Sequence, residues 1–256
     1  MNYQEKQLLQ SMSYFNWHPF IPEAFYEQKG YNVLHSITKN LPYEENQDAL
    51  KFVNQYLCKA KRLESDADVL RFASDSVTVS GAFLEMGVRI GKTINFIAAL
   101  NSKETIYGFD SFAGFPEDWD IGHEYVPVMS KDLLALENTP AFVDGKFLPP
   151  IAKNVILFKG YFHEILPKFK DQILKNSPIA FLHIDCDIYS STKDVFDALG
   201  SNIVKGTIIA FDELYNYPNY KEHEWKALQE FQKKSGFNIE FIAFNIYHRQ
   251  VVVKII

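Results

Sequence analysis

The chain has 256 residues, 47% hydrophobic and 23% charged, so it is long enough for one large folded domain and does not resemble a disordered protein. Acidic residues outnumber basic ones by 32 to 26, and no run of Lys or Arg forms a stripe suited to a phosphate backbone, which argues against nucleic acid as a partner. Because the chain has only two cysteines, we expect no disulfide framework. The N-terminus has no apolar leader and no apolar run is long enough to span a membrane, so we expect a cytoplasmic protein without membrane contact, and a homo-oligomer stays open.

The first 65 residues combine many aromatic side chains with mixed charges, and Pro19, Pro22 and Pro42 interrupt the pattern. Such a segment predicts short helices joined by loops. We therefore expect residues 1–65 to form a helical appendage or lid, and residues 66–256 to form the main domain.

The main domain opens with a βαβ unit. Residues 77–84 read as a strand, 93–100 as a helix and 105–109 as a second strand that ends at Asp110. Residues 111–150 contain five prolines and few periodic apolar positions, which predicts a long loop around one short helix. A loop of this length usually forms a lid or a substrate wall.

Further strands and helices alternate along the rest of the chain. The expected strands are 154–158, 179–184 and 207–211, the expected helices include 191–199 and 225–234, and the expected final pair of strands is 238–244 and 250–255. This alternation predicts an α/β fold with a Rossmann-like, doubly wound, mostly parallel sheet. The last two strands, joined by a short link, predict an antiparallel hairpin at the C-terminus.

A glycine-containing loop, residues 85–93, lies where the first strand passes into a helix. Such loops let the backbone approach a ligand closely and direct free N–H groups toward it. A dinucleotide is disfavoured, because Arg89 stands where the dinucleotide pattern needs a glycine.

A nucleoside triphosphate is a second candidate ligand. Gly91-Lys92-Thr93 resembles the end of a P-loop, and Phe181 to Asp185 resembles the strand and acid that hold magnesium. The P-loop pattern would need glycine at Met86, so this loop is one residue too short to wrap phosphates in the same way. A P-loop-like kinase remains the alternative.

S-adenosylmethionine (SAM) is the third candidate. It requires a carboxylate at the first strand end, close-packing glycines and an acid at the second strand end, and Glu85, Gly87, Gly91 and Asp110 supply these. Asp110 follows Gly87 by 23 residues, near the spacing of about 20 for a ribose-binding acid. Alternatively, Asp110 merely caps the following turn.

Four ordered motifs add a family resemblance. They are Gly108 to Trp119 (GFDSFAGFPEDW), Gly160 to Pro167 (GYFHEILP), His183 to Thr192 (HIDCDIYSST) and Gly206 to Glu213 (GTIIAFDE). Together they resemble the macrocin O-methyltransferase family from about Gly81 to the C-terminus. The resemblance implies a class I SAM-dependent methyltransferase that methylates hydroxyls of sugars or other natural products with the help of a divalent metal, which we expect to be Mg²⁺.

The resemblance also implies site residues. Asp185, Asp212 and Glu213 fall on the metal ligands, and Asp187 falls on the catalytic base, so Asp187 and Asp185 are the expected catalytic residues. Glu213 departs from the more usual Asp at its position. The cofactor-binding residues expected are Glu85, Gly87, Gly91, Thr93, Asp110, Ser111, Phe112, Gly160, Tyr161, Phe162 and Asp185.

Chemistry supports the metal independently, because carboxylate-bound magnesium can orient a hydroxyl and lower its pKa. Alternatively, Asp185 and Asp187 simply stabilise a helix start. We expect His183, inside an apolar strand, to be a hydrogen-bonded core residue, and His223 to lie either near the acceptor or on a solvated helix face. A module that binds SAM without catalysis remains a further alternative.

Overall fold

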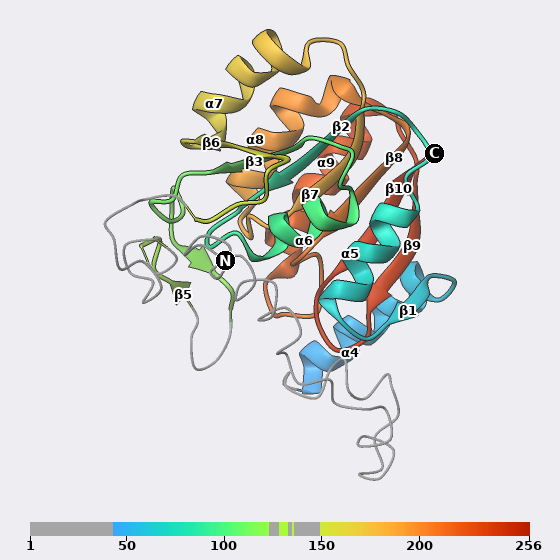
Figure 1. Ribbon diagram of the computed structural model, residues 1–256. Helices are drawn as coiled ribbons and strands as arrows, with labels where there is room; N and C mark the ends of the chain where they lie inside the picture. The colour runs from blue at the N-terminus through green and yellow to red at the C-terminus, as the bar shows by residue number, and fades with distance from the viewer. Residues whose placement is uncertain (1–42, 123–127, 133–134, 136–148) are drawn as a thin grey trace, which may run out of the picture.

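The computed structural model describes residues 43–122, 128–132, 135 and 149–256, and its centre is an eight-stranded sheet (Figure 1). Across the sheet the order is β1 (Lys61–Leu63), β9 (Ile239–Asn245), β10 (Val251–Ile255), β8 (Ile203–Phe211), β7 (Ile179–Ile184), β2 (Ala82–Met86), β3 (Ile106–Asp110) and β6 (Val155–Lys159). Strand β10 is antiparallel to both of its neighbours, and all other pairs are parallel. The expected mostly parallel sheet with a C-terminal antiparallel hairpin is confirmed.

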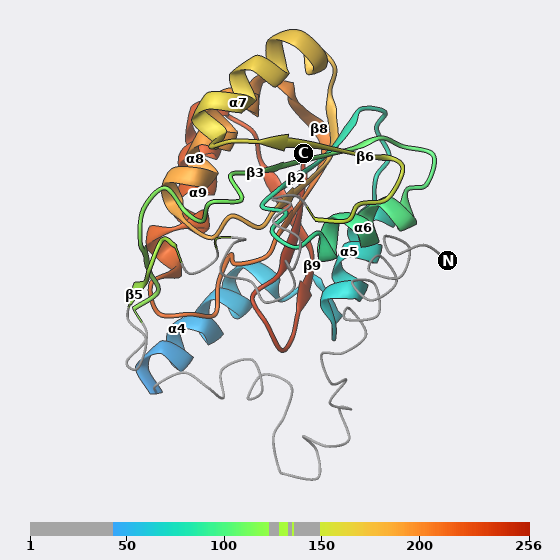
Figure 2. The same ribbon diagram turned by 60° about the vertical axis from the view of Figure 1, so that its left-hand side comes forward.

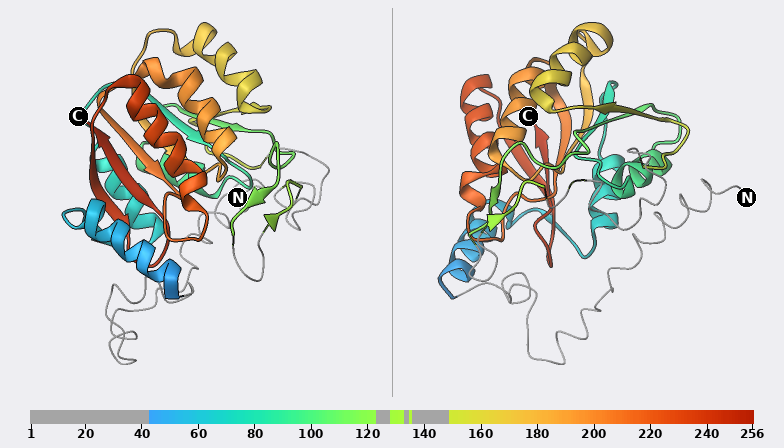
Figure 3. Two further views of the ribbon diagram at one scale, coloured as in Figure 1. Left: turned by 180° about the vertical axis from the view of Figure 1, so that it is seen from behind. Right: turned by 90° about the vertical axis from the view of Figure 1, so that its left-hand side faces the viewer.

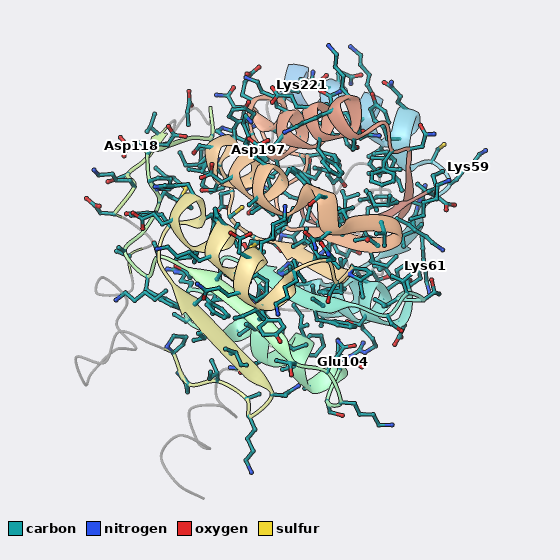
Figure 4. The ribbon with its side chains drawn as sticks, turned by 90° about the horizontal axis from the view of Figure 1, so that it is seen from above. Lys59, Lys61, Glu104, Asp118, Asp197 and Lys221 are labelled. Carbon is teal, nitrogen blue, oxygen red and sulfur yellow. The ribbon has the colours of Figure 1, made fainter. Side chains whose placement is uncertain are left out.

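Helices cover both faces of this sheet (Figures 2 and 3). One face carries α5 (Asp66–Asp75) and α6 (Lys92–Leu100), and the other carries α7 (Phe162–Phe169), α8 (Tyr189–Leu199) and α9 (Glu224–Ser235). Because β7 is sandwiched between the layers, all six of its side chains are buried, and its sequence is apolar except for His183. On the outside of the second layer, Asp197 of α8 pairs with Lys234 of α9 at 2.9 Å (Figure 4).

The described part of the N-terminal segment is built into this domain. Helix α4 (Tyr43–Phe52) continues into a π-helical turn, Val53–Leu57, and the Phe52 ring stacks on Tyr215 at a centroid distance of 5.1 Å. Strand β1 then pairs in parallel with β9 at the sheet edge. Residues 43–65 therefore contribute to the core and to the sheet, whereas residues 1–42 of the expected appendage lie outside the described residues.

The first core strand begins later than the sequence predicts. Strand β2 starts at Ala82, whereas Val77 donates a backbone hydrogen bond to Ser74 in a turn that follows α5. Val77 and Val79 are partly buried against the core beneath α5 and α6, so their apolar side chains serve packing outside the sheet. The β-branched pattern at 77–79 was misleading because a buried connection needs the same residues as a strand.

The long connection after β3 also differs from expectation. Its described residues form a small antiparallel ribbon, β4 (Trp119–Asp120) with β5 (Val128–Met129), and contain no helix. The short helix expected between 111 and 150 can therefore lie only in residues 123–127, 133–134 or 136–148, which are outside the described residues. The remaining helical turns are Lys170–Leu174, Gly200–Asn202 and Tyr220–Glu222.

Candidate active site

Five parallel strands, β8, β7, β2, β3 and β6, end side by side and bring five loops to one edge of the sheet. Four of these loops begin with a backbone hydrogen bond to the neighbouring strand: Gly160 N to Asp110 O, Gly87 N to Phe109 O, Asp185 N to Met86 O, and Asp212 N to Ile184 O, at 2.8–2.9 Å. The chain order reverses between β2 and β7, and ligands of open α/β sheets bind at such a switch point. The fold thus fixes the backbone from which the candidate residues project.

Gly87 stands at this switch point with φ +95°, and a Cβ there would lie 1.7 Å from the carbonyl oxygen of Asp185. Only glycine fits, because the backbone of one loop rests directly on the backbone of the other. Gly91 is also left-handed, with φ +80°, and it forms the N-cap of α6. The loop between these two glycines therefore has a tightly defined path.

Asp110 fastens that loop from the end of β3. One carboxylate oxygen accepts hydrogen bonds from Val88 N at 2.8 Å and Arg89 N at 2.7 Å, and the other accepts from Phe112 N at 2.6 Å. The turn-capping alternative for Asp110 is thus realised in the bond to Phe112. The carboxylate also faces a cavity, so capping and ligand contact are compatible.

Glu85 lies beneath the loop and is fully buried. Its strand register places it beside His183, whose Nδ1 lies 3.0 Å from Glu85 Oε1. Burial raises the pKa of Glu85, and His183 partly offsets this effect. His183 is therefore the hydrogen-bonded core residue that the sequence predicts, and Glu85 supports the site from below.

A cavity of about 590 Å³ opens over the strand ends. Most of the expected site residues line it, namely Gly87, Thr93, Asp110, Ser111, Gly160, Tyr161, Phe162, Asp185, Asp187, Asp212 and Glu213. Glu85, Gly91 and Phe112 are not in its lining: Glu85 and Phe112 are buried, and Gly91 caps the helix behind the wall. Residues from five separate loops thus converge on one space.

The carboxylates of the third and fourth motifs form an acid cluster on the cavity wall, which we define as Asp185, Asp187, Asp212 and Glu213. Burial, followed by the charge of Asp212, raises the pKa of Asp187 to about 7, although Arg249 and Arg89 oppose the shift. Burial and the charges of Asp212 and Asp187 also raise the pKa of Asp185 well above its usual range. Such a cluster favours protonation or the arrival of a cation.

Two neighbours of the acid cluster orient its outer members. Gln250 Nε2 donates to Asp212 Oδ1 at 3.0 Å, and Arg249 Nη1 donates to Glu213 Oε2 at 3.2 Å. Among the described residues, the group whose possible ligand atoms all lie within 4.8 Å of one another is Glu85, His183 and Asp185. The expected ligands Asp185, Asp212 and Glu213 share the wall but are less tightly gathered, since Glu213 is turned to Arg249.

Aromatic side chains close the other side of the cavity. Phe115, Trp119, Tyr161 and Phe162 line it, and the Tyr161 ring stacks on that of His163 with an interplanar angle of 10°. The buried indole nitrogen of Trp119 has no hydrogen-bond partner among the described residues. This wall offers flat apolar surfaces and a donor that still needs an acceptor.

Residues 43–248 match the family described as macrocin-O-methyltransferase (TylF). The match covers well over half of the chain. This chain belongs to the macrocin-O-methyltransferase family. It is therefore a SAM-dependent methyltransferase, and the expected family and enzyme class are confirmed.

The fold of this chain is shared by a solved structure, and a second solved structure is similar to it. The calicheamicin methyltransferase CalS11 aligns over 99% of this chain and 93% of its own, with 21% identity and a TM-score of 0.55. The O-methyltransferase NovP aligns over 73% and 78%, with 21% identity and a TM-score of 0.49. A comparison with curated proteins finds no match.

Several residues that line the cavity of this family member were not among the expected site residues. They are Asp66, Val88, Arg89, Ile90, Lys92, Gly114, Phe115, Pro116, Trp119, His163, Cys186, Ser191, Asp194. Phe115 and Trp119 belong to the first family motif, and Arg89 and Lys92 to the glycine loop, so proximity in sequence was an available signal for them. Asp66 had no such signal, because only the fold brings α5 to the strand ends.

No helix among the described residues is both long enough and apolar enough to cross a membrane.

Proposed function

We propose that this protein transfers the methyl group of SAM to a hydroxyl of a sugar or another small natural product, with assistance from a divalent metal. One observation carries the proposal: a single cavity joins Gly87 and Asp110 at one end to the acid cluster at the other. A methyl donor and a hydroxyl acceptor can therefore lie side by side in one cavity, as in-line transfer requires.

The cofactor would occupy the side of the cavity formed by the glycine loop and Asp110. The Asp110 carboxylate can accept bonds from ribose hydroxyls on the face that its three backbone donors leave open. Tyr161 and Phe162 would pack on the adenine. Gly87 lets the glycine loop rest on the backbone of Asp185, so the cofactor side of the cavity lies next to the acid cluster. Glu85 has no contact with the cofactor in this arrangement and acts through the loop above it.

The acid cluster would handle the acceptor. As the acceptor oxygen bonds to the methyl carbon, the carbon–sulfur bond breaks, and Asp187 takes the hydroxyl proton. Asp187 is 7% exposed, and its backbone has φ +63°, a conformation that is unfavourable for a residue with a side chain. The surrounding structure therefore fixes the position of its carboxylate at the cavity wall. Rate would arise from alignment of the two reactants and from removal of water around them.

A divalent cation fits this cluster on electrostatic grounds. Buried carboxylates that raise one another's pKa gain more from a cation than isolated ones do. Asp185, Asp212 and Glu213 would hold it, and when bound it would polarise the acceptor oxygen and lower the pKa of its hydroxyl. Oxygen donors of this kind suit Mg²⁺.

The aromatic wall supports a ring-shaped, hydroxyl-bearing acceptor. Phe115 and Trp119 line the cavity, so the apolar face of a sugar can lie against their rings.

The direct test measures transfer of labelled methyl groups from SAM to a panel of free sugars, nucleotide sugars and glycosylated natural products, with Mg²⁺ or with chelator. We expect transfer to a hydroxyl of at least one glycosylated acceptor, and a large loss of turnover in chelator. SAM binding without transfer to any acceptor would instead identify a non-catalytic module, and undiminished turnover in chelator would remove the metal from the proposal.

A further inference from the structure

One pair of opposite charges on the cavity wall has no part in the mechanism above. Lys92 Nζ lies 3.7 Å from Asp66 Oδ2, beyond ordinary hydrogen-bond distance, and both side chains are about one-fifth exposed, at 18% and 21%. Both residues line the cavity. Lys92 is the first residue of α6 and Asp66 is the first residue of α5, so two neighbouring helices aim opposite charges into the same space.

The pair lies toward the β8 end of the cavity, away from Asp110. Asn245 contacts Asp66 at 3.4 Å and also donates to Gln250 at 2.9 Å, and Gln250 in turn donates to Asp212, the residue that follows β8, at 3.0 Å. Three strand spacings, or roughly 14 Å, separate β8 from β3 and its Asp110. A ligand with its ribose at Asp110 that extends across β2 and β7 would bring its other end to this pair.

The pair also has a defined orientation. Asn245 Nδ2 contacts Asp66 Oδ1 at 3.4 Å, which leaves Oδ2 directed toward Lys92. Lys92 sits on the first turn of α6, directly after the left-handed Gly91. The two charged groups thus project from different helices, each with its own fixed backbone. A small zwitterionic group can therefore bind between them while both helices stay in place.

We propose that Asp66 and Lys92 bind the amino-acid tail of SAM, with the ammonium group at Asp66 and the carboxylate at Lys92. The tail carries these opposite charges on one carbon, which matches the charges and the spacing of the pair. The inference rests on the proposed cofactor site. It also gives a role to Gly91-Lys92-Thr93, the segment that resembles a P-loop: its lysine receives a carboxylate in place of a phosphate.

Three ligands separate the two contacts: SAM, decarboxylated SAM, which lacks only the carboxylate, and 5′-methylthioadenosine, which lacks both charged groups of the tail and also the sulfonium charge. Isothermal titration would measure each dissociation constant for the wild type, Lys92→Met and Asp66→Asn. We expect Lys92→Met to weaken SAM by about tenfold to a hundredfold and decarboxylated SAM by less than about threefold. We expect Asp66→Asn to weaken both of these ligands and to leave 5′-methylthioadenosine unchanged.

Two matched controls remove general effects of charge. Arg89→Gln deletes a positive charge from the same cavity, and Asp75→Asn deletes a negative charge from the far end of α5. Neither should change the ratio of the dissociation constants for SAM and decarboxylated SAM by more than about twofold, a small fraction of one charge-assisted hydrogen bond. Equal weakening of all three ligands by Lys92→Met, or a changed ratio in Arg89→Gln instead, would overturn the inference. A wild type that binds none of the ligands would overturn the proposed cofactor site itself.

Discussion

The backbone of Gly87 rests on the carbonyl oxygen of Asp185, so the glycine loop and the start of the acid cluster share one rigid contact. We expect Gly87→Ala to destabilise the protein by more than about 2 kcal/mol, because the cost of a positive φ adds to the cost of a collision between the new Cβ and the backbone. Gly236→Ala is the control, since Gly236 has φ +75° but open space around its Cβ, and it should cost only about 1–2 kcal/mol. Chemical denaturation measures both. Equal costs would show that the contact with Asp185 is unimportant.

Removal of the Asp110 carboxylate should weaken SAM binding by about tenfold or more while the fold persists. Asp110→Ala deletes the acceptor of three backbone N–H groups as well as the ribose contact, so a modest fall in melting temperature should accompany the loss. Titration calorimetry and circular dichroism measure the two effects. Asp75→Ala, at an exposed position on α5, is the control. Unchanged affinity in Asp110→Ala would contradict the proposed ribose contact.

Asp187→Asn separates chemistry from binding. An amide cannot take the acceptor proton, so we expect kcat to fall by about 10²- to 10⁴-fold while the dissociation constant for SAM changes less than about threefold. Asp212→Asn should give the same division between turnover and affinity. A parallel loss of SAM affinity in either variant would place that residue with the cofactor instead of the acceptor.

Stability without metal should fall as pH rises from about 5 to 8. Burial raises the folded-state pKa of Asp187 to about 7 from an ordinary value of 3.8, so protonation favours the folded state most at low pH and this contribution is lost as pH rises through 7. Mg²⁺ needs deprotonated carboxylates, so its stabilisation should grow over the same interval. We expect melting-temperature changes on the order of 5 °C, measured in chelator and in excess Mg²⁺. A Mg²⁺ effect that is larger at pH 5 than at pH 8 would contradict this assignment.

Glu85→Gln tests whether Glu85 acts from below the loop. Glutamine can keep the hydrogen bond to His183 in either tautomer of the ring, so we expect SAM affinity to stay within about threefold and stability to change by about 1 kcal/mol. Calorimetry and denaturation measure these quantities. A tenfold loss of SAM affinity with unchanged stability would show that Glu85 reaches the cofactor directly.

The sheet and its order of elements were readable from sequence because buried parallel strands carry continuous apolar runs. The strand Ile179–Ile184 has the predicted bounds, and the final hairpin is shifted by only one residue at most ends. Val77 and Val79 misled the assignment, since a β-branched residue packed against a helix looks the same as one in a strand. Strand β1 was missed because three residues with two exposed charges carry no periodic signal.

The sequence predicts those site residues that lie at the ends of recognisable strands. Asp110 is the last residue of a strand, and Asp185 and Asp212 each follow one, so sequence places all three at one edge of the sheet. Sequence does not show which acids face the cavity: Glu85, one residue before the end of β2, points into the core. Nor could it show Asp66 beside Lys92, because that approach depends on how α5 packs against α6.

The edge strand β1 links the beginning of the described chain to the acid cluster. Ile246 N donates to Leu63 O at 2.9 Å, Asn245 Nδ2 donates to Gln250 Oε1 at 2.9 Å, and Gln250 in turn holds Asp212. Substitutions around Leu63 could therefore shift the carboxylates of the acid cluster from outside the cavity. Relatives that differ in this early segment would then differ in turnover even where the residues that line the cavity are identical.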